Sequence, residues 1–340
     1  MLSTESIEKL WKAIQKELEK IPEFDVERAY DKSYRYERIK LDVNILKQVI
    51  FKEHRGVKKS TFSVSELRKL DLSEVDFAGV DISEDDLSYT NANINPQIVA
   101  GKRLMGTNLA GLDLKGKDFA GVDIDGANLS NTGADIDPQT VRSKSLKRTN
   151  LTGLDLKGKD FTGVRIQGAN LSNTGADIDP QKVYDKSLNW TNLTGLDLTG
   201  KDFAGVDIVG ANLSNTGADI DPQTVYNKSL YCANLTGLDL KGKNFADVDI
   251  REANLSNTGA DIDPQTTRHK NLCGANLAGL DLSGKNFTGV YIDDANLSYT
   301  NANINPQTAY GKSLFCSENF LVEIIIGNVK KLVKARNART

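Results

Sequence analysis

The sequence has 340 residues, of which 39% are hydrophobic and 7% aromatic, and its formal net charge at pH 7 is −3. This length allows one large domain or two ordinary ones, but the hydrophobic fraction is low for a conventional globular core. A net charge so close to zero excludes a strong global field. We therefore expect no direct nucleic-acid binding and no membrane contact.

Residues 1–56 are predicted to form a helical N-terminal region, in which Ser3 or Thr4 caps an amphipathic helix. The segment lacks the apolar run of a signal peptide, and no stretch of the chain approaches the length of about 18 apolar residues that a membrane span needs. The cysteines are odd in number and far apart, which favours free thiols in a reducing compartment: Cys232, Cys273 and Cys316. We therefore expect a cytoplasmic protein.

Residues 57–316 contain a 42-residue repeat. Nearly the same string occupies 127–146, 169–188, 211–230 and 253–272. Within one unit, 107–131 divides into five-residue steps (TNLAG, LDLKG, KDFAG, VDIDG, ANLSN), each with a large apolar third residue. Two residues, Thr132 and Gly133, interrupt before three more steps, so a unit is eight steps plus two residues.

A five-residue period fits neither an amphipathic helix nor a flat strand. It predicts a four-sided coil in which every step turns the chain and points one apolar side chain inward. Coils stacked about 4.8 Å apart would then pair their backbones, giving about twelve coils over 57–316. The predicted core residues of one unit are Leu109, Leu114, Phe119, Ile124, Leu129, Ile136, Val141 and Leu146.

Steps such as ANLSN, ADIDP and KDFAG resemble those of the pentapeptide-repeat family, whose unit is Ala, then Asp or Asn, then Leu or Phe, then two variable residues. The resemblance implies an all-β solenoid, a right-handed quadrilateral β-helix. It implies little about function, although some members occupy the DNA site of type II topoisomerases such as gyrase. It also permits a homodimer through a terminus.

The position two residues before each apolar centre departs from this pattern, because it should face inward and be small. It is instead often Lys, as at Lys117, Lys144 and Lys159, or Gln, as at Gln139. A buried, unpaired ammonium is prohibitively costly, so either these side chains turn outward or the DPQTV segments leave the coil. Pro138 would suit a short helix, but we favour coil because Val141 and Leu146 keep the register.

Stacked coils would align two polar ladders on the outer surface. Asn precedes the centres Leu109 and Leu129 and their equivalents, which predicts structural amide stacking. Asp precedes the centres of the next face and forms the possible partner surface: Asp113, Asp135, Asp155, Asp177, Asp197, Asp219, Asp239, Asp261 and Asp281. This Asp ladder is interpreted either as a solvated face beside lysines or as a mimic of DNA. One carboxylate per coil of about 4.8 Å is sparse beside one DNA charge per about 1.7 Å.

Residues 317–340 are predicted to form a C-terminal capping helix, because an open coil end exposes apolar groups and unpaired backbone. Its apolar side would include Phe320, Ile324 and Leu332. The first and last repeat units also differ from the inner ones by carrying Tyr89 and Tyr299, which is typical of terminal repeats.

No cofactor motif, metal-ligand spacing or catalytic constellation is recognisable, and recurring Asp pairs argue for scaffold because catalytic sites are not usually copied. We expect no enzyme activity, no cofactor and no metal. The predicted function is a non-enzymatic rod-shaped scaffold or protein-interaction module that presents Asn and Asp ladders to an unknown protein partner. The alternative is a DNA-mimicking inhibitor or protector of a type II topoisomerase (gyrase).

Overall fold

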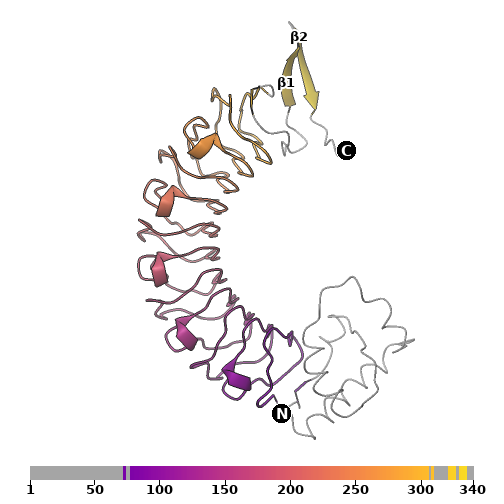
Figure 1. Ribbon diagram of the computed structural model, residues 1–340, viewed down its shortest axis with the longest axis vertical. Coiled ribbons are helices and arrows are strands. Elements are labelled where there is room, and N and C mark those ends of the chain that lie inside the picture. The colour runs from indigo at the N-terminus through magenta and orange to yellow at the C-terminus, as the bar shows by residue number, and fades with distance from the viewer. Residues whose placement is uncertain (1–71, 74–76, 306–307, 310–320, 327–328, 335–340) are drawn as a thin grey trace, which may run out of the picture. The chain divides into compact units, whose positions relative to one another are not determined.

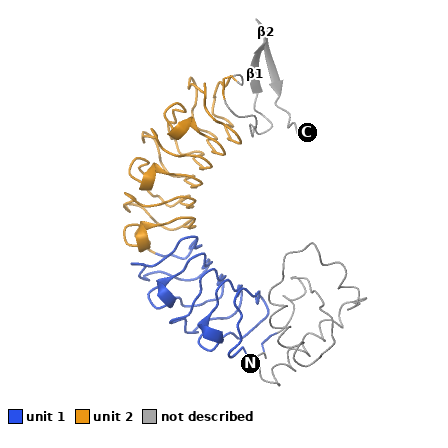
Figure 2. Cartoon of the chain, in the orientation of Figure 1, with its two compact units in different colours: residues 1–176 blue, residues 177–340 orange. Residues whose placement is uncertain are grey.

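The computed structural model describes residues 72–73, 77–305, 308–309, 321–326 and 329–334. The chain divides into two compact units, residues 1–176 and 177–340 (Figure 2). No helix in these described ranges is long and apolar enough to cross a bilayer. The predicted helical region 1–56 lies outside the described residues, and so do both ends of the repeat region, so about twelve coils remains a prediction.

In each unit, the described residues of the repeat region form stacked backbone coils (Figure 1). In the first unit, parallel bridges join Asn108 to Asn128 and Asn128 to Asn150, which are 20 and 22 residues apart. The same alternation recurs in the second unit from Asn192 to Asn276. A coil is thus four five-residue steps, and every second coil holds two extra residues, as the sequence predicts.

The interior of each coil is filled by the centres of the steps. The eight core residues predicted for one unit, from Leu109 to Leu146, are all at most 3% exposed. Small or hydroxyl side chains fill the space between centres: Thr149 is fully buried, and its Oγ1 donates to the Ile124 carbonyl at 3.0 Å. Because every five-residue step buries one apolar side chain, a sequence with few aromatic residues still forms a continuous apolar core.

The four faces of a coil are numbered here by their centres: Leu109 and Leu129 for the first face, Leu114 and Ile136 for the second, Phe119 and Val141 for the third, and Ile124 and Leu146 for the fourth. In the described part of the repeat region, parallel bridges occur on the first face and on the fourth. The second and third faces are joined by single backbone hydrogen bonds, such as Leu114 N to Thr132 O at 2.9 Å.

The DPQTV segments remain within the coil. Asp137 closes a tight turn, since its carbonyl accepts Thr140 N at 3.1 Å and its Oδ1 accepts Gln139 N at 2.9 Å. Val141 is buried, which keeps the register. A single 3-10 turn follows the segment in each copy: Ala100–Lys102, Arg142–Lys144, Tyr184–Lys186, Tyr226–Lys228 and Arg268–Lys270.

The C-terminal helix predicted for 317–340 is wrong where the structure describes it. Strands β1 (Leu321–Ile326) and β2 (Val329–Lys334) form an antiparallel pair in which Leu321 faces Lys334 and Ile326 faces Val329 (Figure 1). Strand β1 is rich in β-branched residues and β2 contains two valines, residues that favour extended backbone. The two connecting residues are Gly and Asn, a pair that favours a two-residue hairpin over a continuing helix.

Candidate functional site

The Asn ladder on the first face forms hydrogen bonds mainly within the coils. Asn128 Oδ1 accepts the backbone N–H of Ser130 at 3.2 Å, and Asn150 Oδ1 accepts the Thr152 hydroxyl at 2.8 Å. Asn276 Nδ2 also donates to Asn254 Oδ1 at 3.0 Å, an amide bond between coils. These half-buried side chains hold their own turns, which supports a structural role.

The Asp ladder on the second face is exposed at all nine predicted positions. Four of its carboxylates pair with a Lys that lies 24 residues later, on the next coil: Asp135 with Lys159, Asp177 with Lys201, Asp219 with Lys243 and Asp261 with Lys285, at 2.5–2.6 Å. The other five carboxylates, those of Asp113, Asp155, Asp197, Asp239 and Asp281, accept the backbone N–H two residues on.

The lysines that precede the Phe centres therefore turn outward at the corner instead of entering the core. The hydrogen bond to Asp135 raises the pKa of Lys159 above its usual value, although partial burial opposes the shift. Lys144 points outward as well, from a 3-10 turn in which its φ is +47°. Gln139 spans to the next coil, where its Nε2 donates to the carbonyls of Asp160 and Thr162 at 3.0 Å.

The fourth face differs from the others because its outer residues change from one repeat to the next. The first three faces repeat NLxG, LDLxG and KDFxG (KNFx in the last two copies) in every second coil, and NLSN, ADIDP and QxV in the inner coils between, with few changes. We call the fourth face, together with the 3-10 turn that precedes its centre in every second coil, the variable face. The residue before the fourth-face centre in every second coil is Asp123, Arg165, Asp207, Asp249 or Tyr291 in successive copies. In the coils between, the first residue after the centre is Lys147, Asn189, Tyr231 or Cys273, and the second is Arg148, Trp190, Cys232 or Gly274. The first residue of the 3-10 turn is Arg142, Tyr184, Tyr226 or Arg268.

The variable face holds every arginine between residues 77 and 305: Arg103, Arg142, Arg148, Arg165, Arg251 and Arg268. It also holds four exposed aromatic side chains, namely Tyr184, Trp190, Tyr226 and Tyr291, which are 38–58% exposed. Arg, Trp and Tyr are the residues that most often carry the binding energy of protein interfaces. Their concentration on one face identifies a candidate binding surface.

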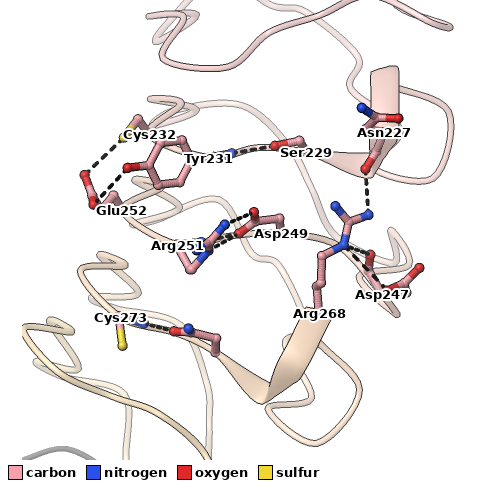
Figure 3. A network of polar contacts seen from close by, with 11 residues as sticks. Asn227, Ser229, Tyr231, Cys232, Asp247, Asp249, Arg251, Glu252, Arg268 and Cys273 are labelled. Atoms are coloured by element: carbon pink, nitrogen blue, oxygen red, sulfur yellow. Dashed lines mark hydrogen bonds and ion pairs between the residues drawn. The ribbon is translucent and has the colours of Figure 1, made fainter.

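An ion pair orders the variable face of the second unit (Figure 3). The Arg251 guanidinium donates to both carboxylate oxygens of Asp249, at 2.9 and 2.6 Å, and lies 5.3 Å from the centre of the Tyr231 ring. Burial opposes ionisation of Asp249, but the bonds from Arg251 outweigh it and lower the pKa of this carboxyl. The pair therefore presents Tyr231 and Arg251 in a fixed geometry.

Glu252 accepts from two neighbours, the Cys232 thiol at 3.1 Å and the Tyr231 hydroxyl at 3.2 Å (Figure 3). Burial and then the bond to Glu252 raise the pKa of Cys232 to about 11. The thiol is therefore protonated near neutral pH and a poor nucleophile. In the part of the chain that the structure describes, no group of three or more His, Cys, Asp or Glu side chains is placed to hold a metal ion.

Two arginines of the variable face clamp neighbouring coils together. Arg268 Nη2 donates to the Asn227 carbonyl at 2.6 Å and its Nε to the Asp247 carbonyl at 3.2 Å (Figure 3). In the first unit, Arg142 Nη2 donates in the same way to the Gly101 carbonyl at 2.7 Å. These guanidiniums stabilise the stack, so the more freely exposed residues beside them are better placed for a partner.

Trp190 lies over Gly210 of the following coil, where an added Cβ would meet the indole ring. Gly210 has a φ of +67°, which favours glycine. The absence of a side chain at this position lets the ring cover the backbone, while 58% of the residue stays exposed to solvent. The backbone of one coil therefore forms the surface on which an aromatic side chain of the previous coil packs.

Five buried oxygens on the variable face accept no hydrogen bond within the described residues: Ser83 Oγ, Asp125 Oδ1, Ser145 Oγ, Gln167 Oε1 and Asn189 Oδ1. A buried acceptor without a donor is unfavourable and rare in native proteins. Independently of residue type, their concentration shows that the polar groups of the variable face are less well satisfied than those of the other faces.

The repeat pattern of the sequence predicts a possible partner surface on the Asp ladder and does not by itself single out the variable face. Asp recurs in every copy of the ladder, but stacked coils require the same residue types at equivalent positions, so this repetition does not indicate binding. The signal that points to the variable face is the opposite one, namely the positions at which otherwise matching copies differ. Aligning the 42-residue units by their apolar centres is sufficient to find it.

A sequence profile of the family described as pentapeptide repeats matches eight copies in this chain, at residues 103–132, 145–174, 187–216, 229–258 and 271–303. This chain is a pentapeptide-repeat protein. Pentapeptide repeats imply a right-handed quadrilateral β-helix, in agreement with the four-step coils. The segments between matches are those with the DPQ turn and the 3-10 turn, which stay within the coil but depart from the usual pentapeptide residues.

No curated protein matches the chain. Among solved structures, it is similar to QnrB1, a plasmid-mediated fluoroquinolone resistance protein. A trypsin-treated form of QnrB1 is 12% identical over 70% of this chain and 87% of that one, with a TM-score of 0.18. The full-length form is 12% identical over 69% and 80%, with a TM-score of 0.13. Because these scores are so low, the fold assignment depends on the repeats themselves.

Proposed function

We propose that this pentapeptide-repeat protein is a non-enzymatic scaffold that binds a protein partner through its variable face. The observation that carries the proposal is that differences among otherwise matching repeats are concentrated on this face, where charged, aromatic and small residues replace one another. Stacking constrains the inward positions and the ladders in the same way in every copy, so it does not explain these differences. The exposed Trp190 and Tyr226 are suited to contact a partner.

The Asp ladder is the weaker candidate for a partner surface. Four of its nine carboxylates already pair with lysines of the same unit, and an incoming cationic group would have to displace an ammonium at 2.5–2.6 Å. The five remaining carboxylates recur on every second coil, about 10 Å apart. The ladder therefore contributes mainly to the framework that orients the variable face.

The alternative, mimicry of DNA toward a type II topoisomerase, has less support from the charge pattern. Duplex DNA carries one charge per about 1.7 Å, far denser than the unpaired carboxylates of the ladder. A supercoiling assay with purified gyrase separates the two functions. Inhibition or protection that is lost when Asp155 and Asp197 are replaced by Asn would favour the mimic, and no effect at tens of micromolar protein would exclude it.

A comparison of two double variants in the second unit tests the proposed function. Tagged wild-type protein, Trp190→Ala/Tyr226→Ala and Asp197→Asn/Asp239→Asn would each be purified from the native host with whatever they bind. We expect one discrete protein to be retained by the wild type and by the Asp variant and lost from the aromatic variant. Loss from the Asp variant alone would assign binding to the ladder and refute the proposal.

A further inference from the structure

The variable face of the first unit has an excess of positive charge. Its exposed and half-buried basic side chains over three consecutive coils form what we call the basic patch: Arg142, Lys144, Lys147, Arg148 and Arg165. The acidic side chains on the same coils of this face are Asp123 and Asp125. Asp123 lies 3.9 Å from Arg142, a weak contact that leaves the excess in place.

The basic side chains are held in two ways. Arg165 Nη1 donates to the Ser143 carbonyl at 2.9 Å, and the stem of Arg148 lies over Gly168, which orients both guanidiniums across neighbouring coils. Lys144 and Lys147 are exposed and extend into solvent. Because guanidiniums bind carboxylates in a bidentate geometry and ammoniums act as point charges, the basic patch suits an anionic partner.

Unsatisfied acceptors lie among these cations. Ser145 is 7% exposed, and its Oγ accepts no hydrogen bond within the described residues; the same holds for the buried Asp125 Oδ1 and Gln167 Oε1. Lys147 lies on the coil between those of Asp125 and Gln167. Gly126 N, next to Asp125, donates to the Lys147 carbonyl, and Arg148 N, next to Lys147, donates to the Gln167 carbonyl. The three oxygens and the basic patch therefore form one surface.

These features together discriminate between partners. A phosphate backbone offers only acceptors, which satisfy the cations and the Ser145 hydroxyl but leave the oxygens of Asp125 and Gln167 without donors. A polypeptide rich in Asp and Glu offers carboxylates for the cations and backbone N–H donors for the oxygens. We propose that the basic patch with Asp125, Ser145 and Gln167 binds an acidic polypeptide segment, an inference that rests on the proposed function and specifies its partner.

Fluorescence anisotropy with a labelled peptide of alternating Glu and Ala tests this proposal on the full chain. We expect saturable binding that weakens with salt. Lys144→Glu/Lys147→Glu/Arg148→Glu should raise the Kd at least about tenfold. The fold should accept Arg148→Glu, since Glu252 occupies the equivalent corner with a similar positive φ. The matched control, Lys115→Glu/Lys157→Glu/Lys241→Glu, makes the same charge change on the second face and should bind as the wild type does.

Ser145→Ala separates the contribution of the buried Ser145 hydroxyl from that of the charges. It should weaken peptide binding by about the same factor at all salt concentrations, without changing the salt dependence, and it should not destabilise the free protein. The proposal is overturned if the control binds as weakly as the patch variant, or if an oligodeoxythymidine of equal charge binds the patch more tightly than the peptide. Self-association through the patch, seen by sedimentation, would also overturn it. If the acidic peptide does not bind but Trp190→Ala/Tyr226→Ala still abolishes retention of the partner from the native host, the inference of an acidic partner is wrong and the proposed function stands.

Discussion

Replacing the four paired ladder lysines by methionine tests whether the ion pairs of the second face are framework. Lys159→Met, Lys201→Met, Lys243→Met and Lys285→Met together keep the aliphatic stems and remove the charges. The partner carboxylates are 72–74% exposed, so solvent screens each pair despite separations of 2.5–2.6 Å. Exposed pairs contribute about 0.5 kcal/mol each. Because the pairs lie about 10 Å apart, their contributions should add to about 2 kcal/mol.

Urea unfolding followed by circular dichroism would measure this loss. The difference from the wild type should shrink in 1 M NaCl, since salt screens exposed pairs. The raised pKa values of Lys159 and Lys201 mean that these pairs stabilise the fold below the unfolded lysine pKa of about 10.5. The contribution is lost as pH rises through the folded pKa values. A variant as stable as the wild type at low salt, or a loss of over about 4 kcal/mol that salt leaves unchanged, would refute this reasoning.

Two further predictions concern the variable face. In a Trp11→Phe background, Gly210→Ala should displace the Trp190 ring and shift its fluorescence. The control is Gly200→Ala, where an added Cβ has open space at a similar φ; it should lose about 1–2 kcal/mol of stability without a fluorescence shift. Equal spectra for both variants would contradict the packing of the Trp190 ring on Gly210. Cys232, with its pKa raised to about 11, should react with iodoacetamide far more slowly at pH 8 than a free thiol and accelerate as pH approaches 11, as followed by peptide mass spectrometry. Fast alkylation at pH 8 would contradict the burial of the Cys232 thiol and its bond to Glu252.

The coil and its core could be predicted from the sequence because one apolar residue in every five is a local and repeated signal. Leu109 and Ile136 are buried for the same reason that they recur. The extra residues Thr132 and Gly133 are also visible, since they break the count. Geometry that depends only on such repetition requires no knowledge of distant parts of the chain.

Contacts between coils were harder to predict because they depend on the corner at which each side chain leaves the backbone. The pairing of Lys159 with Asp135 requires both the register between coils and the outward direction of the lysine. The apolar spacing of 317–340 predicts a helix because apolar residues in a short segment fit either period. The Gly-Asn pair between Ile326 and Val329 favours the hairpin that the strands form.

The central claim is that one face of the coil meets the partner, and a scan around a single coil tests it most directly. A photo-reactive amino acid would be placed in turn at Thr194, Thr199, Ala204 and Val209, one position on each of the four faces, and irradiated in the native host. The account predicts a discrete protein adduct from position 209 and none from the other three. An adduct from position 199 with none from 209 would contradict it.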